Sequence, residues 1–180
     1  MRYAQITPFE VCNGKYAGTS LFVQGCNFHC KGCFNQETWG FNGGKEFTQE
    51  IEDKFFELID KPYIKRVSIL GGEPLADMNV LGIFNLIQKI KDKFPNKAIW
   101  LYTGYTWNQI FYPVITDDFN QDRDKILDHR KKIVEMCDVL IDGRYVDELK
   151  DLTLRFRGSS NQRVILVQES LKQNEVVLYN

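Results

Sequence analysis

Three cysteines stand close together in the segment 24–35, QGCNFHCKGCFN. Cys26, Cys30 and Cys33 lie four and then three positions apart, and His29 is the nearest further donor. A structural zinc site takes four ligands, and a 4Fe-4S cluster normally takes four thiolates. Three cysteines on such a cluster leave one iron with an open coordination position. A small molecule with an amine and a carboxylate can fill that position, and the metal can then take part in chemistry.

Two other interpretations of this spacing stay open. Positions i, i+4 and i+7 also form the stripe of an amphipathic helix. However, the segment contains Gly25, Asn27 and Gly32, which are poor helix formers. The other interpretation is a zinc ion with His29 as its fourth ligand, which would make the chain a zinc-stabilised binding module without catalysis.

The composition favours one soluble globular domain over residues 1–180. Hydrophobic residues make up 43% and charged residues 26%, which are ordinary values for such a protein. The formal net charge of −1 is too small to attract nucleic acid or an anionic membrane electrostatically. The N-terminus lacks a secretory pattern, and no apolar run approaches the roughly 20 residues that span a bilayer. We therefore expect a cytoplasmic protein with reduced thiols. The remaining cysteines, Cys12 and Cys137, are expected to be buried as small hydrophobic residues.

Short apolar runs that end at glycine alternate with segments of helical periodicity. This alternation predicts βαβ units around a mainly parallel sheet. Because a complete eight-unit barrel takes about 250 residues, the expected α/β fold is a partial parallel β/α barrel, with a C-terminal β-hairpin formed by the tail. Strands are predicted at 19–25, 66–72, 98–104 and 138–143, and helices at 48–60, 79–94 and 123–136.

Each predicted strand ends in a short segment whose residues could bind a ligand or take part in chemistry, namely QGC, GGEP, YTGY and DGRY. Parallel sheets place their chemistry at the carboxyl ends of their strands. In GGEP, Gly71 and Gly72 would let the backbone approach a ligand closely, although a tight turn into the next helix explains them equally well. The tail RFRGSSNQR at 155–163 carries three arginines that could bind carboxylates or phosphates, or could form a solvated loop.

The cysteine motif after a first strand, with Phe34 directly following its last cysteine, resembles the signature of the radical S-adenosylmethionine (SAM) superfamily. Together with GGEPL, WLYTGY, DVLIDGRYV and RFRGSSNQR, in this order, it resembles the activating proteins of anaerobic ribonucleoside-triphosphate reductase. The resemblance runs from about Asn13 to Arg163. The long charged stretch 113–130 departs from the pattern and leaves the helix layout there open.

This resemblance implies a radical SAM oxidoreductase that activates a glycyl-radical enzyme. Cys26, Cys30 and Cys33 would each bind one iron of a 4Fe-4S cluster, and SAM would chelate the fourth iron. Reductive cleavage of SAM would yield methionine and a 5′-deoxyadenosyl radical, which would take a hydrogen atom from a glycine of the large reductase subunit. The electron donor would be a flavodoxin-like or ferredoxin-like protein. The alternatives are an activase for another glycyl-radical enzyme and a small-molecule radical SAM enzyme.

The resemblance also assigns residues to SAM. Gly32 and Cys33 would wrap the cluster, while Phe34 would stack on the adenine or else pack in the core. The methionine end and the ribose or substrate would be contacted by residues at the ends of the next three strands. The resemblance gives Gly71, Gly72 and Glu73 for the methionine end. Thr103 and Asp142 are candidates for the ribose or substrate because they lie at the ends of strands on the same face.

Overall fold

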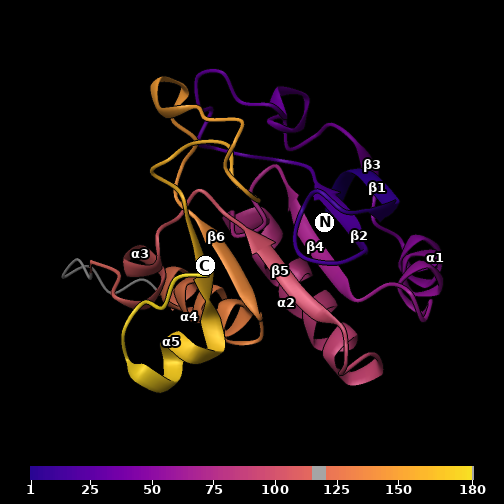
Figure 1. Ribbon diagram of the computed structural model, residues 1–180. Coiled ribbons are helices and arrows are strands. Elements are labelled where there is room, and N and C mark those ends of the chain that lie inside the picture. Colours follow the sequence, from indigo (N-terminus) through magenta and orange to yellow (C-terminus); the bar gives the residue numbers. More distant parts are fainter. Residues whose placement is uncertain (115–120, 180) are drawn as a thin grey trace.

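The computed structural model describes residues 1–114 and 121–179, which form an α/β fold around one seven-stranded sheet (Figure 1). The strand order is β3-β1-β2-β4-β5-β6-β7. The strands are β1 (Arg2–Glu10), β2 (Gly18–Val23), β3 (Lys45–Glu46), β4 (Arg66–Gly71), β5 (Ala98–Tyr102), β6 (Val139–Asp142) and β7 (Arg163–Leu166). The helices are α1 (Gln49–Ile59), α2 (Asp77–Lys93), α3 (Trp107–Phe111), α4 (Gln121–Glu135) and α5 (Val167–Gln173).

The middle of the sheet is parallel, as predicted. Strands β2, β4, β5 and β6 run in the same direction, and helices connect β4 to β5 and β5 to β6. At the margins, β1 and β3 pair antiparallel on one side and β7 on the other. The parallel strands therefore end at one common edge, where the loops 24–44 and 143–162 lie side by side (Figure 1).

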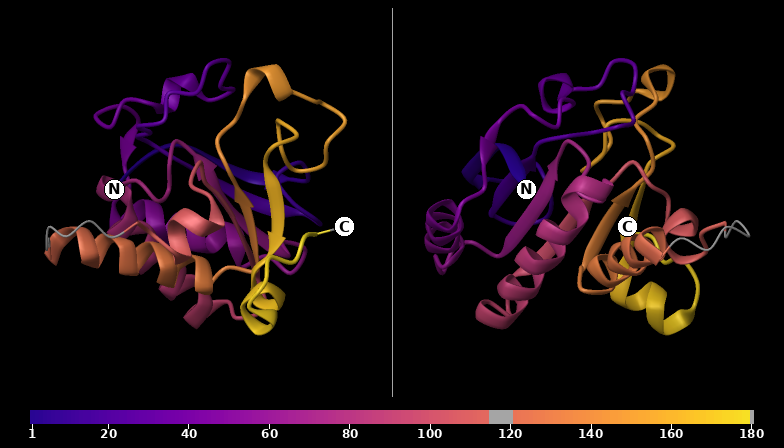
Figure 2. Two further views of the ribbon diagram at one scale, coloured as in Figure 1. Left: turned by 90° about the vertical axis from the view of Figure 1, so that its left-hand side faces the viewer. Right: turned by 180° about the vertical axis from the view of Figure 1, so that it is seen from behind.

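The two faces of the sheet have different partners. Figure 2 shows the long helices gathered on one side of the sheet, where strand residues such as Leu21, Ile69 and Leu101 pack with helix residues in the main core. On the opposite face, Trp100 packs against Phe156 and other groups outside the helices, and forms a second, smaller apolar cluster. This alternation along each strand is what period-two side-chain geometry requires when both faces are covered.

Capping side chains and a proline set the ends of the predicted helices. Thr48 caps α1 by accepting a hydrogen bond from the Ile51 N–H at 3.4 Å, and the fully buried Phe55 and Ile59 lie on the face that meets the sheet. Helix α2 ends just before Pro95, which cannot continue a helix. The helix expected at 123–136 corresponds to α4, whereas residues 115–120 of the charged stretch lie outside the described residues.

The tail differs from its prediction. The predicted C-terminal β-hairpin is not confirmed, because α5 occupies the position of the expected strand end and turn. The chain then returns antiparallel to β7 through a β-bridge between Ile165 and Leu178. Gln168 of α5 attaches this helix to the end of α4, since its Nε2 donates to the carbonyls of Glu135 and Cys137 at 2.9 and 2.8 Å.

A buried ion pair joins the first strand to the middle of the sheet. The Arg66 Nη1 lies 2.5 Å from the Glu10 Oε1, and their side chains are 1% and 11% exposed. Arg66 also donates to the Ser68 hydroxyl at 2.6 Å, and the Ser20 hydroxyl donates to Glu10 at 2.7 Å. Burial works against the Glu10 charge, yet the hydrogen bonds from Arg66 and Ser20 hold the pKa of Glu10 below its ordinary value.

Membrane insertion has no candidate element in the described part of the chain. None of its helices combines the length and the apolar character that a membrane span needs.

Candidate functional site

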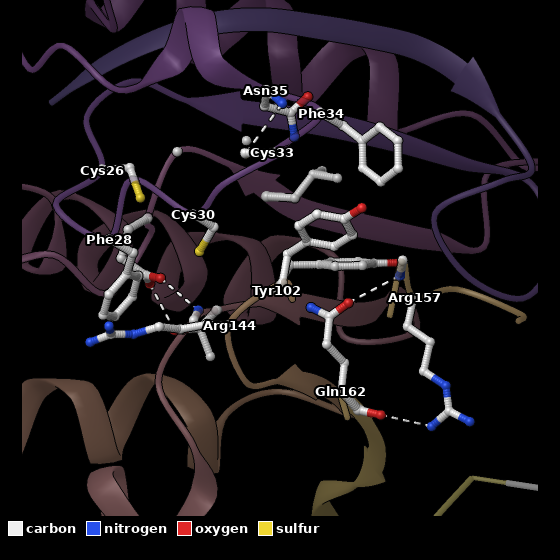
Figure 3. A pocket seen from close by; sticks show the side chains of 18 of the residues that line it. Cys26, Phe28, Cys30, Cys33, Phe34, Asn35, Tyr102, Arg144, Arg157 and Gln162 are labelled. Carbon is white, nitrogen blue, oxygen red and sulfur yellow. Dashed lines mark hydrogen bonds between the residues drawn. The ribbon is translucent and has the colours of Figure 1, made fainter. Parts of the chain in front are cut away.

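The carboxyl ends of the four parallel strands meet at a pocket of about 480 Å³ (Figure 3). Register brings the ends together, because Val23 of β2 pairs with Gly71 of β4, and Tyr102 of β5 pairs with Ile141 of β6. The sequence-predicted residues that line this pocket are Cys26, Cys30, Cys33, Phe34, Gly71, Gly72, Glu73 and Thr103. Predicted site residues from separate segments of the chain, from Cys26 to Thr103, thus meet in one place.

Backbone hydrogen bonds anchor the start of the cysteine loop to the loop after β4. The Gly72 N–H donates to the Val23 carbonyl at 2.9 Å, and the Glu73 N–H donates to the Gly25 carbonyl at 2.8 Å. Gly25 has a φ of +97°, a conformation that glycine adopts without the strain of a side chain. A side chain at Gly72 would collide with the Gly25 carbonyl oxygen. Glycine is therefore required at both positions for the two loops to meet.

Backbone N–H groups surround the three thiols. The Asn35 N–H donates to the Cys33 Sγ at 3.4 Å. The N–H groups of Phe28 and His29 favour the Cys26 thiolate, and that of Tyr145 favours the Cys30 thiolate. Hydrogen bonds of this kind to sulfur are a standard feature of iron–sulfur sites.

Burial and mutual repulsion oppose these donors. Burial raises the pKa of the Cys26 thiol, and the negative charge of Glu73 adds to the effect. Burial likewise raises the pKa of Cys30, with a further contribution from the nearby Cys33. The thiolates are thus close enough to repel one another, and a cationic metal centre would relieve that repulsion.

The three cysteine thiols lie apart from one another at the pocket (Figure 3). Around a tetrahedral zinc ion, with Zn–S bonds near 2.3 Å, sulfur atoms lie about 3.8 Å apart and converge on one point. In the described residues, no three histidine, cysteine or acidic side chains converge in this way. Figure 3 shows Cys26, Cys30 and Cys33 spread around one side of the pocket.

His29, the potential fourth zinc ligand, makes a different contact. Its ring packs against Trp39 at a centroid distance of 4.7 Å. The helical interpretation of the cysteine motif is wrong, because this segment contains turns and irregular backbone, with positive φ angles at His29 (+47°) and Gly32 (+70°).

Glu73 lies at the centre of a buried hydrogen-bond network. Its carboxylate accepts from the Thr103 hydroxyl and the Leu75 N–H, each at 2.8 Å, and from the Gly104 N–H at 2.7 Å. The residue is 1% exposed, and this burial raises its pKa to about 7, even though the three donors and the Arg130 charge act in the opposite direction. A cation that bound in the pocket beside Glu73 would stabilise its charged form.

Two predicted SAM-contacting residues do not line the pocket. Gly32 is exposed and faces the Asp147 carboxylate, although its positive φ agrees with a tight wrap of the loop. Asp142 is 1% exposed, and its carboxylate pairs with the Arg163 guanidinium and accepts from the Trp107 N–H at 2.7 Å. The structure brings the other predicted residues together but leaves these two outside.

Phe34 and the remaining cysteines have distinct environments. Phe34 is 58% exposed and lies 5.3 Å from the Tyr145 ring, so the alternative of core packing is wrong. Cys137 is fully buried, as predicted, and its thiol donates to the Ile133 carbonyl at 3.2 Å. The expectation of burial is wrong for Cys12, which is exposed because it lies in the irregular loop after β1.

The arginine-rich tail supports the loop after β6. Asn161 donates to the Arg144 carbonyl at 2.8 Å, and Gln162 donates to the Gly143 carbonyl at 3.0 Å. Arg163 pairs with Asp142, and Arg157 donates to the Gln162 carbonyl at 2.8 Å. These contacts are internal, so at least these two arginines help to hold the strand-end loop in position.

Sequence reasoning missed Arg144 as a site residue. Its guanidinium lies 4.3 Å from the Phe28 ring, it lines the pocket, and its charge favours the Cys30 thiolate. The sequence DGRY at a predicted strand end contains this arginine two residues after Asp142, so the position of Arg144 at a strand end was a usable signal.

Comparison with known proteins places this site in a family. A family model described as "4Fe-4S single cluster domain" matches residues 12–165. The anaerobic ribonucleoside-triphosphate reductase-activating protein of Vibrio cholerae is 38% identical over 164 residues, which is 90% of this chain and 96% of the relative. The corresponding protein of Salmonella typhimurium is 39% identical over 166 residues, or 91% of this chain and 97% of the relative. That of Enterobacteria phage T4 is 34% identical over 164 residues, with shares of 91% and 93%. The chain therefore belongs to the family of anaerobic ribonucleoside-triphosphate reductase-activating proteins, which carry a 4Fe-4S domain.

Proposed function

We propose that this protein is a radical SAM activase that installs a glycyl radical in an anaerobic ribonucleoside-triphosphate reductase. The observation that carries the proposal is that three cysteines, each with a backbone N–H donor near its thiol, line one pocket at the ends of the parallel strands. The names of the relatives support the reductase as the target.

In this proposal Cys26, Cys30 and Cys33 each hold one iron of a 4Fe-4S cluster, and SAM occupies the iron that no cysteine holds. A bound and reduced cluster would supply the low-potential electron for reductive cleavage of SAM into methionine and a 5′-deoxyadenosyl radical. The chain's own residues orient SAM and keep water away from it.

The residues at the end of β4 suit the amino-acid part of SAM. Gly71 and Gly72 line the pocket with backbone, so a ligand can approach without meeting a side chain. The Glu73 carboxylate suits an ammonium group, and Thr103 fixes its orientation through the 2.8 Å hydrogen bond. Phe34, at the exposed rim, can cover the adenine by stacking.

The open sheet also suits a macromolecular substrate. We propose that the sheet acts as a partial barrel in a single radical SAM domain over residues 1–180. A glycine within another protein must reach the radical, and an incomplete barrel leaves an open side through which it can enter. An electron donor of the flavodoxin or ferredoxin type completes the proposal.

Mixing experiments test this function directly. The anaerobically reconstituted and reduced protein is combined with SAM and the large reductase subunit, and the mixture is examined by electron paramagnetic resonance (EPR). We expect a glycyl radical signal on the reductase that requires all three components. If the complete mixture gives no such signal while SAM is cleaved, the chain acts on a different substrate.

A further inference from the structure

The pocket extends beyond the residues assigned to the cluster and to SAM. Phe22, Leu70 and Tyr102 line it from the ends of β2, β4 and β5. The segment 152–158 supplies a further wall, which includes Leu152 and Leu154. Figure 3 shows the cysteines on one side of the pocket and Arg157 with Gln162 on the other, with Tyr102 between them. This second half of the pocket is mainly apolar and has no role in the mechanism described above.

Two polar groups in this half have no hydrogen-bond partner within the described residues. Within the described residues, the Tyr102 hydroxyl is buried and makes no hydrogen bond, and the same is true of the Arg157 Nε. Burial raises the pKa of Tyr102, so its hydroxyl keeps the proton and remains a donor. A buried donor without an acceptor is unfavourable unless a ligand supplies one. The pocket therefore fits a ligand with acceptor oxygens between apolar groups.

The wall at 152–158 also carries an unpartnered apolar side chain. Leu152 is 79% exposed, although it lines the same pocket as the half-buried Leu154. An exposed leucine at the edge of an apolar pocket gains free energy when a ligand covers it. The apolar surface thus continues from the interior of the pocket to the outside, where a larger partner can reach it.

We propose that this half of the pocket is the subsite for the glycine-bearing segment of the reductase, with the Tyr102 hydroxyl donating to a main-chain carbonyl and Leu152 contacting a flanking apolar side chain. This inference rests on the proposed function. A peptide segment has the required chemistry, because its carbonyls are acceptors and its side chains are spaced along the backbone. The lack of a side chain on glycine lets its Cα approach the reacting centre closely.

Tyr102→Phe and Leu152→Asp test the subsite, with Tyr112→Phe and Leu81→Asp as matched controls on exposed tyrosine and leucine residues outside the pocket lining. Two quantities are measured anaerobically with the reconstituted full chain. The first is the affinity for the large reductase subunit by titration calorimetry, and the second is the release of 5′-deoxyadenosine without the reductase. We expect each subsite variant to weaken reductase binding about tenfold, and both controls to bind like the wild type.

The release of 5′-deoxyadenosine without the reductase separates this subsite from SAM binding. It should stay within about twofold of the wild type in both subsite variants, because a tenfold change in peptide affinity does not act on SAM. If Tyr102→Phe slows this release as much as it weakens reductase binding, the hydroxyl serves SAM and the inference is wrong. Unchanged reductase affinity in both subsite variants also overturns it. A wild-type protein that binds the reductase but forms no glycyl radical instead contradicts the proposed function.

Discussion

The Thr103 hydroxyl donates to the Glu73 carboxylate at 2.8 Å and so joins the loop after β4 to the loop after β5 at the pocket. The Gly104 N–H donates to the second oxygen of the same carboxylate at 2.7 Å. Glu73 is therefore both a pocket-lining charge and a structural tie between two strand ends. Burial disfavours the charged form of this carboxylate, and the stability of the fold should therefore depend on pH.

The raised pKa of Glu73 predicts that the apoprotein loses stability as the pH rises. The folded state holds the proton up to about pH 7, whereas the unfolded chain releases it near the ordinary value of 4.5. The Glu73 contribution to stability is therefore complete below pH 4.5 and declines up to about pH 7, by roughly 3 kcal/mol in total. Urea unfolding between pH 4.5 and 8 should show this decline in the wild type and a smaller one in Glu73→Gln. Equal slopes in the two proteins would count against the buried carboxyl.

Cys30→Ala should abolish cluster assembly. With two thiolates left, the loop cannot hold a 4Fe-4S cluster, so the anaerobically reconstituted variant should be colourless and should not cleave SAM. Cys137→Ala is the matched control, because Cys137 is fully buried and does not line the pocket. This variant should assemble the cluster with the wild-type iron content. Iron analysis and the visible spectrum measure both variants. Full iron content in Cys30→Ala would show that this residue is not a ligand.

Gly72→Ala should disrupt the contact between the cysteine loop and the loop after β4. The added methyl group would collide with the Gly25 carbonyl, and relieving the overlap should cost about 1–3 kcal/mol of unfolding free energy. Gly40→Ala provides the control, since a side chain there meets nothing within 4 Å. Chemical denaturation of the apoproteins should show a lower unfolding free energy in Gly72→Ala alone. SAM should also bind more weakly to the reconstituted Gly72→Ala protein alone. Wild-type behaviour in both assays would show that the two loops have more room than the structure indicates.

Glu10→Gln should destabilise the fold by about 3 kcal/mol, because it leaves the buried Arg66 guanidinium without its negative partner. The lowered pKa of Glu10 adds a prediction at acid pH. Its contribution is present above the ordinary value of 4.5 and is lost as the pH falls through the lower folded value. Urea titrations of the apoproteins should therefore show the largest difference near neutral pH and a smaller one in acid. A difference that persists unchanged at low pH would exclude the ion pair as its source.

The cysteine motif and the strand ends were predictable because their geometry is local. Each parallel strand is a short apolar run that ends at a glycine or an acidic turn, and parallel pairing brings these ends to one edge. The pocket position of Cys26, Gly72 and Thr103 follows from this rule.

Long-range contacts were not predictable in the same way. Arg144 lies on the Phe28 ring only because Asn161 and Gln162 hold its loop, and no periodicity in the sequence indicates those contacts. Helix α5 was missed for a similar reason, since Gln168 gains its hydrogen bonds from the distant end of α4. The prediction that Asp142 contacts SAM shows the same limit, because its carboxylate is paired with the distant Arg163.

In the proposed function, three cysteines hold the cluster and SAM occupies the iron that they leave open. The most direct measurement is the EPR spectrum of the anaerobically reduced, reconstituted protein before and after the addition of SAM. The account predicts a 4Fe-4S signal that changes its shape when SAM is added, because SAM becomes a ligand of one iron. A 4Fe-4S signal that stays unchanged at saturating SAM, or a reconstituted protein that contains zinc and no iron, would contradict it.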